Sequence, residues 1–132
     1  GQIPELYSFE KRKAIGTSII DGTEREDFCP DDSALVCRTD KGLFIITGCS
    51  HSGICSITEY ARRVCREQRV TGIIGGFHLF DKNAQLTETI HFLEALSADT
   101  LYPCHCVSLK AKAEMLKCMD IEEVGVGLTI QI

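Results

Sequence analysis

Three histidines and the cysteines beside them are the residues of this sequence best suited to chemistry. His51, His78 and His105 each follow an apolar run that predicts a strand. Neutral imidazole is the commonest protein ligand for metal ions, and thiolates stand close by at Cys49 and at the cysteines that flank His105. These nitrogen and sulfur donors favour zinc, with iron or manganese as alternatives.

The predicted strands would bring these residues together although they are far apart in the chain. In open α/β sheets, ligands gather beyond the carboxyl ends of the strands. We therefore expect Cys49, His51, His78 and His105 to form one cluster at that edge of a sheet. His91 lies inside a predicted helix, and we expect it to serve only surface or helix packing.

Two other kinds of site could use the same residues. The Cys104-His105-Cys106 triplet could hold a closed structural zinc, but neighbouring residues of a strand point to opposite faces, so the histidine and the cysteines would not share one ion. Cys49 and His51 could instead be a nucleophile and its base, since a nearby imidazole activates a thiolate. We keep both as alternatives.

The elements that must position these residues alternate between strand and helix from residue 34 onward. Two β-rich runs, ALVCRT and LFIITG, are joined by a short turn at 40–42 and predict an antiparallel hairpin. Apolar residues then recur at helical spacing over 53–68, around Leu86 to Leu96, and after Ser108, which suits a helix N-cap. Further strands are expected at 70–76, 101–104 and 127–132. This order predicts an α/β fold whose mixed, mostly parallel sheet has flanking helices.

Residues 1–33 differ from the rest in composition. They are polar, hold two of the three prolines and an acidic stretch, and contain one short strand candidate at 14–20. We expect an irregular, exposed N-terminal arm over 1–33 and one folded unit over 34–132.

Composition excludes several classes of protein. The chain has 132 residues, 44% hydrophobic and 25% charged, as in ordinary globular domains. The net charge of −5 and the scattered basic residues argue against a nucleic-acid partner, and no apolar run is long enough to cross a membrane. The eight cysteines lie mostly in apolar runs, where free cysteine acts as a small hydrophobe. We expect a reducing compartment, the cytoplasm.

Three strings, GCSHSGI, IIGGFHL and PCHC, in this order and with helices between them, resemble the C-terminal half of metallo-β-lactamase-superfamily proteins. The branch is the one that includes dihydropterin-type, β-ribofuranosylaminobenzene 5′-phosphate related synthases. The resemblance implies half of an αββα sandwich with one or two metal ions at an edge of the sheets. It also implies a metal-dependent hydrolase or synthase acting on a small molecule.

The resemblance assigns residues to the site one by one. His105, in PCHC, matches the last histidine ligand of the superfamily. Cys49 or His51, in GCSH, falls where the superfamily places an aspartate or cysteine ligand, and His78, in GGFHL, would bind metal or substrate.

The HxHxDH motif of the superfamily's N-terminal half is absent. We therefore expect a truncated chain that is inactive alone and that associates with the missing N-terminal half or with itself. The alternative is a non-catalytic half-fold that serves in binding or assembly.

Overall fold

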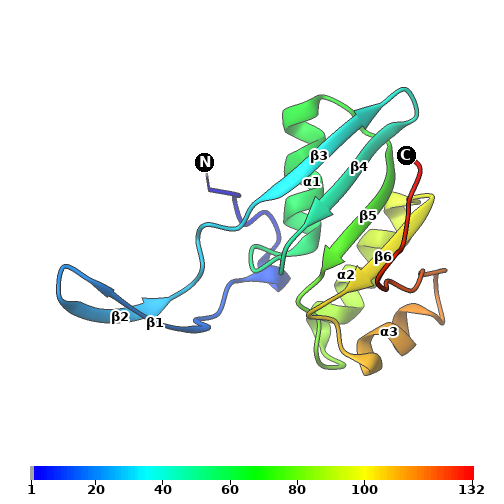
Figure 1. The fold of residues 1–132 in the computed structure, drawn as a ribbon. Coiled ribbons are helices and arrows are strands. Elements are labelled where there is room, and N and C mark those ends of the chain that lie inside the picture. The colour runs from blue at the N-terminus through cyan, green and yellow to red at the C-terminus, as the bar shows by residue number, and fades with distance from the viewer. Residues whose placement is uncertain (1) are drawn as a thin grey trace.

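The computed structural model describes residues 2–132 and is built around a four-stranded mixed sheet (Figure 1). Its strands lie in the order β3 (Ala34–Thr39), β4 (Gly42–Thr47), β5 (Val70–Gly76) and β6 (Thr100–Cys104). The first pair is antiparallel and the other two are parallel. The predicted hairpin is confirmed, with its turn at residues 40–41 and Gly42 as the first residue of β4, and so is the mixed sheet.

Two helices connect the parallel strands and cover one face of the sheet. Helix α1 (Ile54–Cys65) joins β4 to β5, and α2 (Ala84–Leu96) joins β5 to β6, both behind the sheet in Figure 1. Helix α3 (Leu109–Met115) follows β6, and the side chain of its N-cap, Ser108, accepts a hydrogen bond from the backbone N–H of Ala111, as predicted. The core between sheet and helices contains Ile45, Ile57, Ile73, Phe77, Leu93 and Leu101, all buried.

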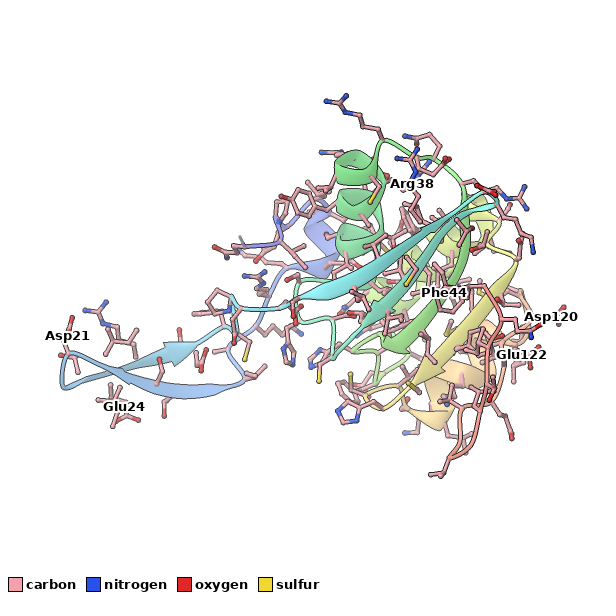
Figure 2. All side chains as sticks on the ribbon, turned by 45° about the horizontal axis from the view of Figure 1, so that its top comes forward. Asp21, Glu24, Arg38, Phe44, Asp120 and Glu122 are labelled. Atoms are coloured by element: carbon pink, nitrogen blue, oxygen red, sulfur yellow. The ribbon has the colours of Figure 1, made fainter. Side chains whose placement is uncertain are left out.

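Among residues 2–132, the C-terminal segment is what covers the opposite face of the sheet. Residues 120–132 cross in front of the sheet without forming a strand (Figures 1 and 2), so the predicted final strand at 127–132 is wrong. Its alternating apolar residues instead lie against the sheet, where Leu128, Ile130 and Ile132 line a pocket with Phe44 and Ile46. Phe44 is 4% exposed, whereas Leu35 on edge strand β3 is 63% exposed.

Residues 2–33 are more ordered than the irregular, exposed arm that we expected over 1–33. Strands β1 (Gly16–Ile20) and β2 (Thr23–Asp27) form an antiparallel hairpin that projects from the sheet, with Asp21 and Glu24 near its tip (Figure 2). Before it, the short 3₁₀ helix η1 (Ser8–Glu10) packs against the helical side, and Ile3 joins the core. The boundary at residue 33 stays a prediction.

None of the helices between residues 2 and 132 combines the length and apolar character that a bilayer crossing needs.

Candidate metal and substrate site

Three loops that follow β4, β5 and β6 meet at the carboxyl edge of the sheet. The backbone N–H of Gly76 donates to the carbonyl of Gly48 at 2.8 Å, which joins the first loop to the end of β5. The N–H of Leu79 donates to the carbonyl of Cys106 at 3.1 Å, which joins the second loop to the third. Segments that are distant in the sequence are thus held together by main-chain hydrogen bonds.

The ligand atoms of Cys49, His105 and Cys106 lie within 4.8 Å of one another. The Cys106 thiol also donates to the backbone carbonyl of Cys49, with an Sγ to O distance of 3.2 Å. Contrary to our expectation, His105 lies close enough to one of its neighbouring cysteines, Cys106, for both to bind one ion, because β6 ends at Cys104. His105 has a φ of +47°, outside the strand conformation, so the alternation of faces no longer applies to Cys106.

Gly76 makes this close approach possible. A Cβ on Gly76 would overlap the Sγ of Cys106 and would lie 2.9 Å from the Gly48 carbonyl oxygen and 3.2 Å from the Cα of Cys49. Burial, with a smaller effect of neighbouring Cys49, raises the pKa of Cys106 to about 11. The thiol is therefore protonated at neutral pH until a cation replaces its proton.

His51 and His78 form a second group beside the first. Their rings meet edge to face with centroids 4.7 Å apart, and the His78 ring lies 5.0 Å from that of Phe80 in a similar arrangement. Burial, and then the neighbouring His51, lowers the pKa of His78, which favours the neutral ring. The sequence placed His51 and His78 at this edge correctly, but their ligand atoms are outside the close group of Cys49, His105 and Cys106.

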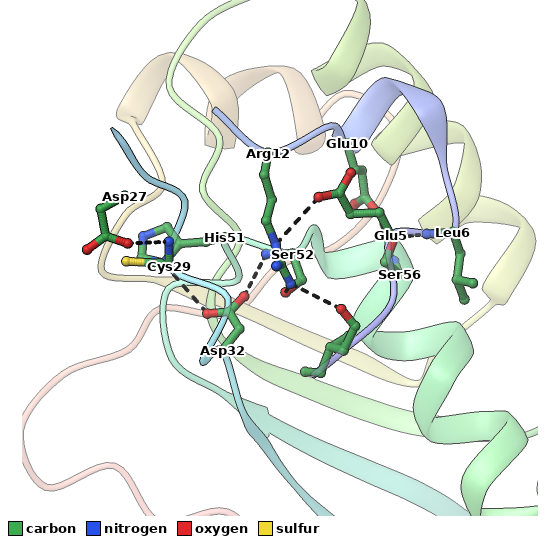
Figure 3. A network of polar contacts seen from close by, with 11 residues as sticks. Glu5, Leu6, Glu10, Arg12, Asp27, Cys29, Asp32, His51, Ser52 and Ser56 are labelled. Carbon is green, nitrogen blue, oxygen red and sulfur yellow. Dashed lines mark hydrogen bonds and ion pairs between the residues drawn. The ribbon is translucent and has the colours of Figure 1, made fainter. Parts of the chain in front are cut away.

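A polar network reaches His51 from the N-terminal segment (Figure 3). One carboxylate oxygen of Asp32 accepts a hydrogen bond from the backbone N–H of Ser52 at 2.6 Å, and the other lies 3.7 Å from Nδ1 of His51. The guanidinium of Arg12 donates to the hydroxyl of Ser52 and, at 3.1 Å, to the carbonyl of Ile3. Arg12 is only 8% exposed, so this network is part of the interior.

Buried Glu10 caps helix α1, although it lies 45 residues before Cys55 in the sequence. Gly53 precedes α1 and offers no side-chain cap, so the first N–H groups of the helix need another acceptor. The Glu10 carboxylate accepts from the N–H groups of Cys55 and Ser56 and from the Ser56 hydroxyl, each at 2.8 Å. Burial raises the pKa of Glu10 more than these hydrogen bonds lower it.

Sequence reasoning missed two residues of this site, Phe80 and Asp32. Cys106 was considered as a thiolate donor, but it was not joined to His105 because the strand was assumed to continue, and a lone aromatic in a loop, such as Phe80, carries no pattern. Asp32 lies in an acidic stretch that we assigned to the arm. Its position two residues before β3 was the available signal, because β3 begins at the sheet edge that carries the loop after β4.

Two further expectations concern the cysteine nucleophile and His91. Among the hydrogen bonds of residues 2–132 none joins Cys49 to His51, so the nucleophile and base pair gains no support. His91 is exposed on α2 and lies outside the three loops, as expected.

Comparisons with known proteins place this arrangement in a family. No family model matches the chain. The chain is 36% identical, over 131 residues, to 7,8-dihydropterin-6-methyl-4-(β-D-ribofuranosyl)-aminobenzene-5′-phosphate synthase of Methanocaldococcus jannaschii, covering 96% of this chain and 45% of that protein. A crystal structure of a metal-dependent hydrolase of the β-lactamase superfamily matches with a TM-score of 0.81 and 27% identity, covering 100% of this chain and 57% of that one. The chain belongs to the metallo-β-lactamase superfamily.

A second relative is an uncharacterised protein of Methanocaldococcus jannaschii, 30% identical over 133 residues, covering 100% of this chain and 48% of that protein. The chain thus spans about half the length of the curated relatives it matches. The predicted fold class, a mixed sheet with flanking helices that is half of a metallo-β-lactamase fold, is confirmed.

Proposed function

We propose that this chain supplies part of the divalent metal site of a metal-dependent hydrolase or synthase that acts on a small molecule. The observation that carries the proposal is the approach of Cys49, His105 and Cys106 within 4.8 Å at the carboxyl edge of the sheet. The solved structure of a metal-dependent hydrolase of the β-lactamase superfamily supports the activity class, and the synthase relative supports the alternative of a synthase.

The donors suit the proposed metal. Two thiols and one imidazole are ligands that zinc prefers, and three protein ligands leave a position open for water or substrate. When bound, such an ion lowers the pKa of a coordinated water and polarises the substrate. Of our earlier ligand candidates, Cys49 and His105 belong to this group. We propose that His51 and His78, whose rings meet edge to face, contact the substrate beside it.

The remaining ligands of a mono- or dinuclear site would come from a partner. We propose that this partner is the other half of the protein, or a second copy of the chain, and that it covers the exposed apolar residues of the sheet face. Leu35 and Ile46, which are 63% and 39% exposed, would be part of the contact. The eight cysteines, all free in the described structure, suit the cytoplasm.

Zinc content tests the proposal. We expect the chain alone to bind zinc weakly and to show no metal-dependent turnover, and we expect both to rise when the rest of the protein is supplied. In that complex, Cys49→Ser, His105→Asn and Cys106→Ser should each weaken zinc binding, by roughly tenfold or more. Cys118→Ser is the matched control, because Cys118 is exposed and follows the C-terminal end of α3, whereas these loops precede its N-terminal end.

Elemental analysis after equilibrium dialysis gives the zinc content, and phosphodiester hydrolysis gives a first assay of turnover. Zinc content that is unchanged in the Cys49, His105 and Cys106 variants would refute the proposed ligands. A complex that holds zinc but hydrolyses no ester or phosphoester would favour the alternative of a non-catalytic binding module.

A further inference from the structure

We propose that Asp32 positions His51 so that its ring binds a hydroxyl or amine of the substrate, and that His51 is not a metal ligand. This inference rests on the proposed function, since it places the imidazole beside the metal-binding group of Cys49, His105 and Cys106. It deepens that function by stating what kind of substrate group the site recognises.

The position of the Asp32 carboxylate determines which nitrogen of His51 carries the proton. Asp32 Oδ1 lies 3.7 Å from His51 Nδ1, closer to an ion-pair contact than to a hydrogen bond, and such contacts are often long before a substrate binds. The side chains of His51 and Asp32 are only 19% and 8% exposed. A carboxylate accepts hydrogen bonds and does not donate them, so it favours the proton on Nδ1.

Asp32 is itself held rigidly in place. Its other oxygen accepts the N–H of Ser52 at 2.6 Å, and the Ser52 hydroxyl is in turn bound by the buried guanidinium of Arg12. Arg12 also lies 3.7 Å from the carboxylate of Glu5 (Figure 3). The loop that carries His51 is therefore fixed by residues of the N-terminal segment.

With the proton on Nδ1, Nε2 has a free lone pair. An acceptor of this kind binds a hydrogen-bond donor, which means a hydroxyl, an amine or a reacting water. The ring of His78, 4.7 Å away, limits how His51 can turn, and Phe80, which is 48% exposed, extends the same wall with an apolar surface. The wall thus suits a molecule that has both a donor group and an apolar or aromatic part.

The same pairing of carboxylate and imidazole also orients histidines that bind metals. The positions of the ligand atoms favour the substrate role here. The group that closes within 4.8 Å consists of Cys49, His105 and Cys106, and it does not include His51, although His51 is only two residues from Cys49.

The tautomer of His51 can be measured directly. Nitrogen-15 NMR of the ring at about pH 8, where ordinary imidazole is neutral, should show the Nδ1–H form in the wild-type protein. Asp32→Asn keeps an oxygen that can accept the Ser52 N–H but removes the charge, and we expect it to shift His51 towards the Nε2–H form. Asp31→Asn, at the exposed neighbouring residue, is the matched control and should leave the tautomer unchanged.

Zinc content of the complex with the rest of the protein separates the two roles of the histidines. His51→Asn should retain the wild-type zinc stoichiometry, while His105→Asn should lower it. Loss of zinc in His51→Asn would overturn the inference, and so would an Nε2–H tautomer in the wild type or no change in Asp32→Asn. If instead His105→Asn also keeps its zinc, the proposed metal site is wrong while the Asp32 and His51 pairing can still be judged by NMR.

Discussion

Replacement of Glu10 by alanine should destabilise the protein more than any single surface change. Its carboxylate is 3% exposed and accepts three hydrogen bonds of 2.8 Å from the first turn of α1. Glu10→Ala would leave the N–H groups of Cys55 and Ser56 and one hydroxyl buried without their acceptor. Three hydrogen bonds at roughly 1 kcal/mol each give about 3 kcal/mol, and the loss of a helix cap, counted as a whole, costs up to about 2 kcal/mol. Both figures estimate the same loss, so the free energy of unfolding should fall by about 2–3 kcal/mol.

Urea denaturation followed by circular dichroism measures this free energy. Glu10→Gln keeps one acceptor oxygen and should lose about 1 kcal/mol, since its amide nitrogen cannot accept the remaining donors. Glu24→Ala, at an exposed carboxylate near the hairpin tip, is the control and should leave the stability unchanged. If Glu10→Ala stayed within about 0.5 kcal/mol of the wild type, water would be replacing the carboxylate and the capping argument would be wrong.

Three further predictions follow from the same structure. Because burial raises the pKa of Glu10, the folded protein keeps its proton to higher pH than the unfolded chain, so urea melts should show the wild type losing stability relative to Glu10→Gln as the pH rises from about 4 to 7. Gly76→Ala should lower zinc affinity, measured by competition with a chelator, because its Cβ would displace the Sγ of Cys106; unchanged affinity would remove Cys106 from the ligand set. Deletion of residues 123–132 should expose Phe44 and increase the binding of a hydrophobic dye, and no increase would show that the C-terminal segment does not cover the sheet.

What could be predicted from the sequence depended on how local the decisive contact was. The hairpin of β3 and β4 was predictable because its turn and both its strands lie within 14 residues, 34–47. The final strand was predicted wrongly because an alternation of apolar residues indicates which side chains become buried. It does not indicate whether a neighbouring strand is available for backbone hydrogen bonds. Residues 127–132 do place apolar side chains against the sheet, but in the described structure their backbone has no ladder to join.

The site shows the same limit. That Cys49, His51, His78 and His105 would gather at one sheet edge followed from topology alone. How they divide into a metal-binding group and a histidine pair depended on where β6 ends, and on the left-handed conformation of the residue after it. Asp32 and Glu10 act across 20 and 45 residues of chain, respectively, and no local pattern indicates such contacts.

The backbone provides an independent reason to treat this edge of the sheet as functional. A residue other than glycine pays about 1–2 kcal/mol to adopt the left-handed conformation, so each case needs a cause. Arg66 and Ser97 end helices and Asp21 lies in a tight turn, where this conformation is common. The four that remain belong to the candidate site or adjoin it: Cys29, Ser50, His78 and His105.

Strain of this kind persists only where the surrounding structure imposes it, and it concentrates at sites of binding and catalysis. Apart from the turn and the helix ends just named, it falls on all three loops that follow β4, β5 and β6 at the carboxyl edge of the sheet, at Ser50, His78 and His105. In two of these loops the strained residue is itself a candidate site histidine. The fold therefore gives up stability to set the directions of these rings, which is the expected cost of a preorganised site rather than of a surface that only packs.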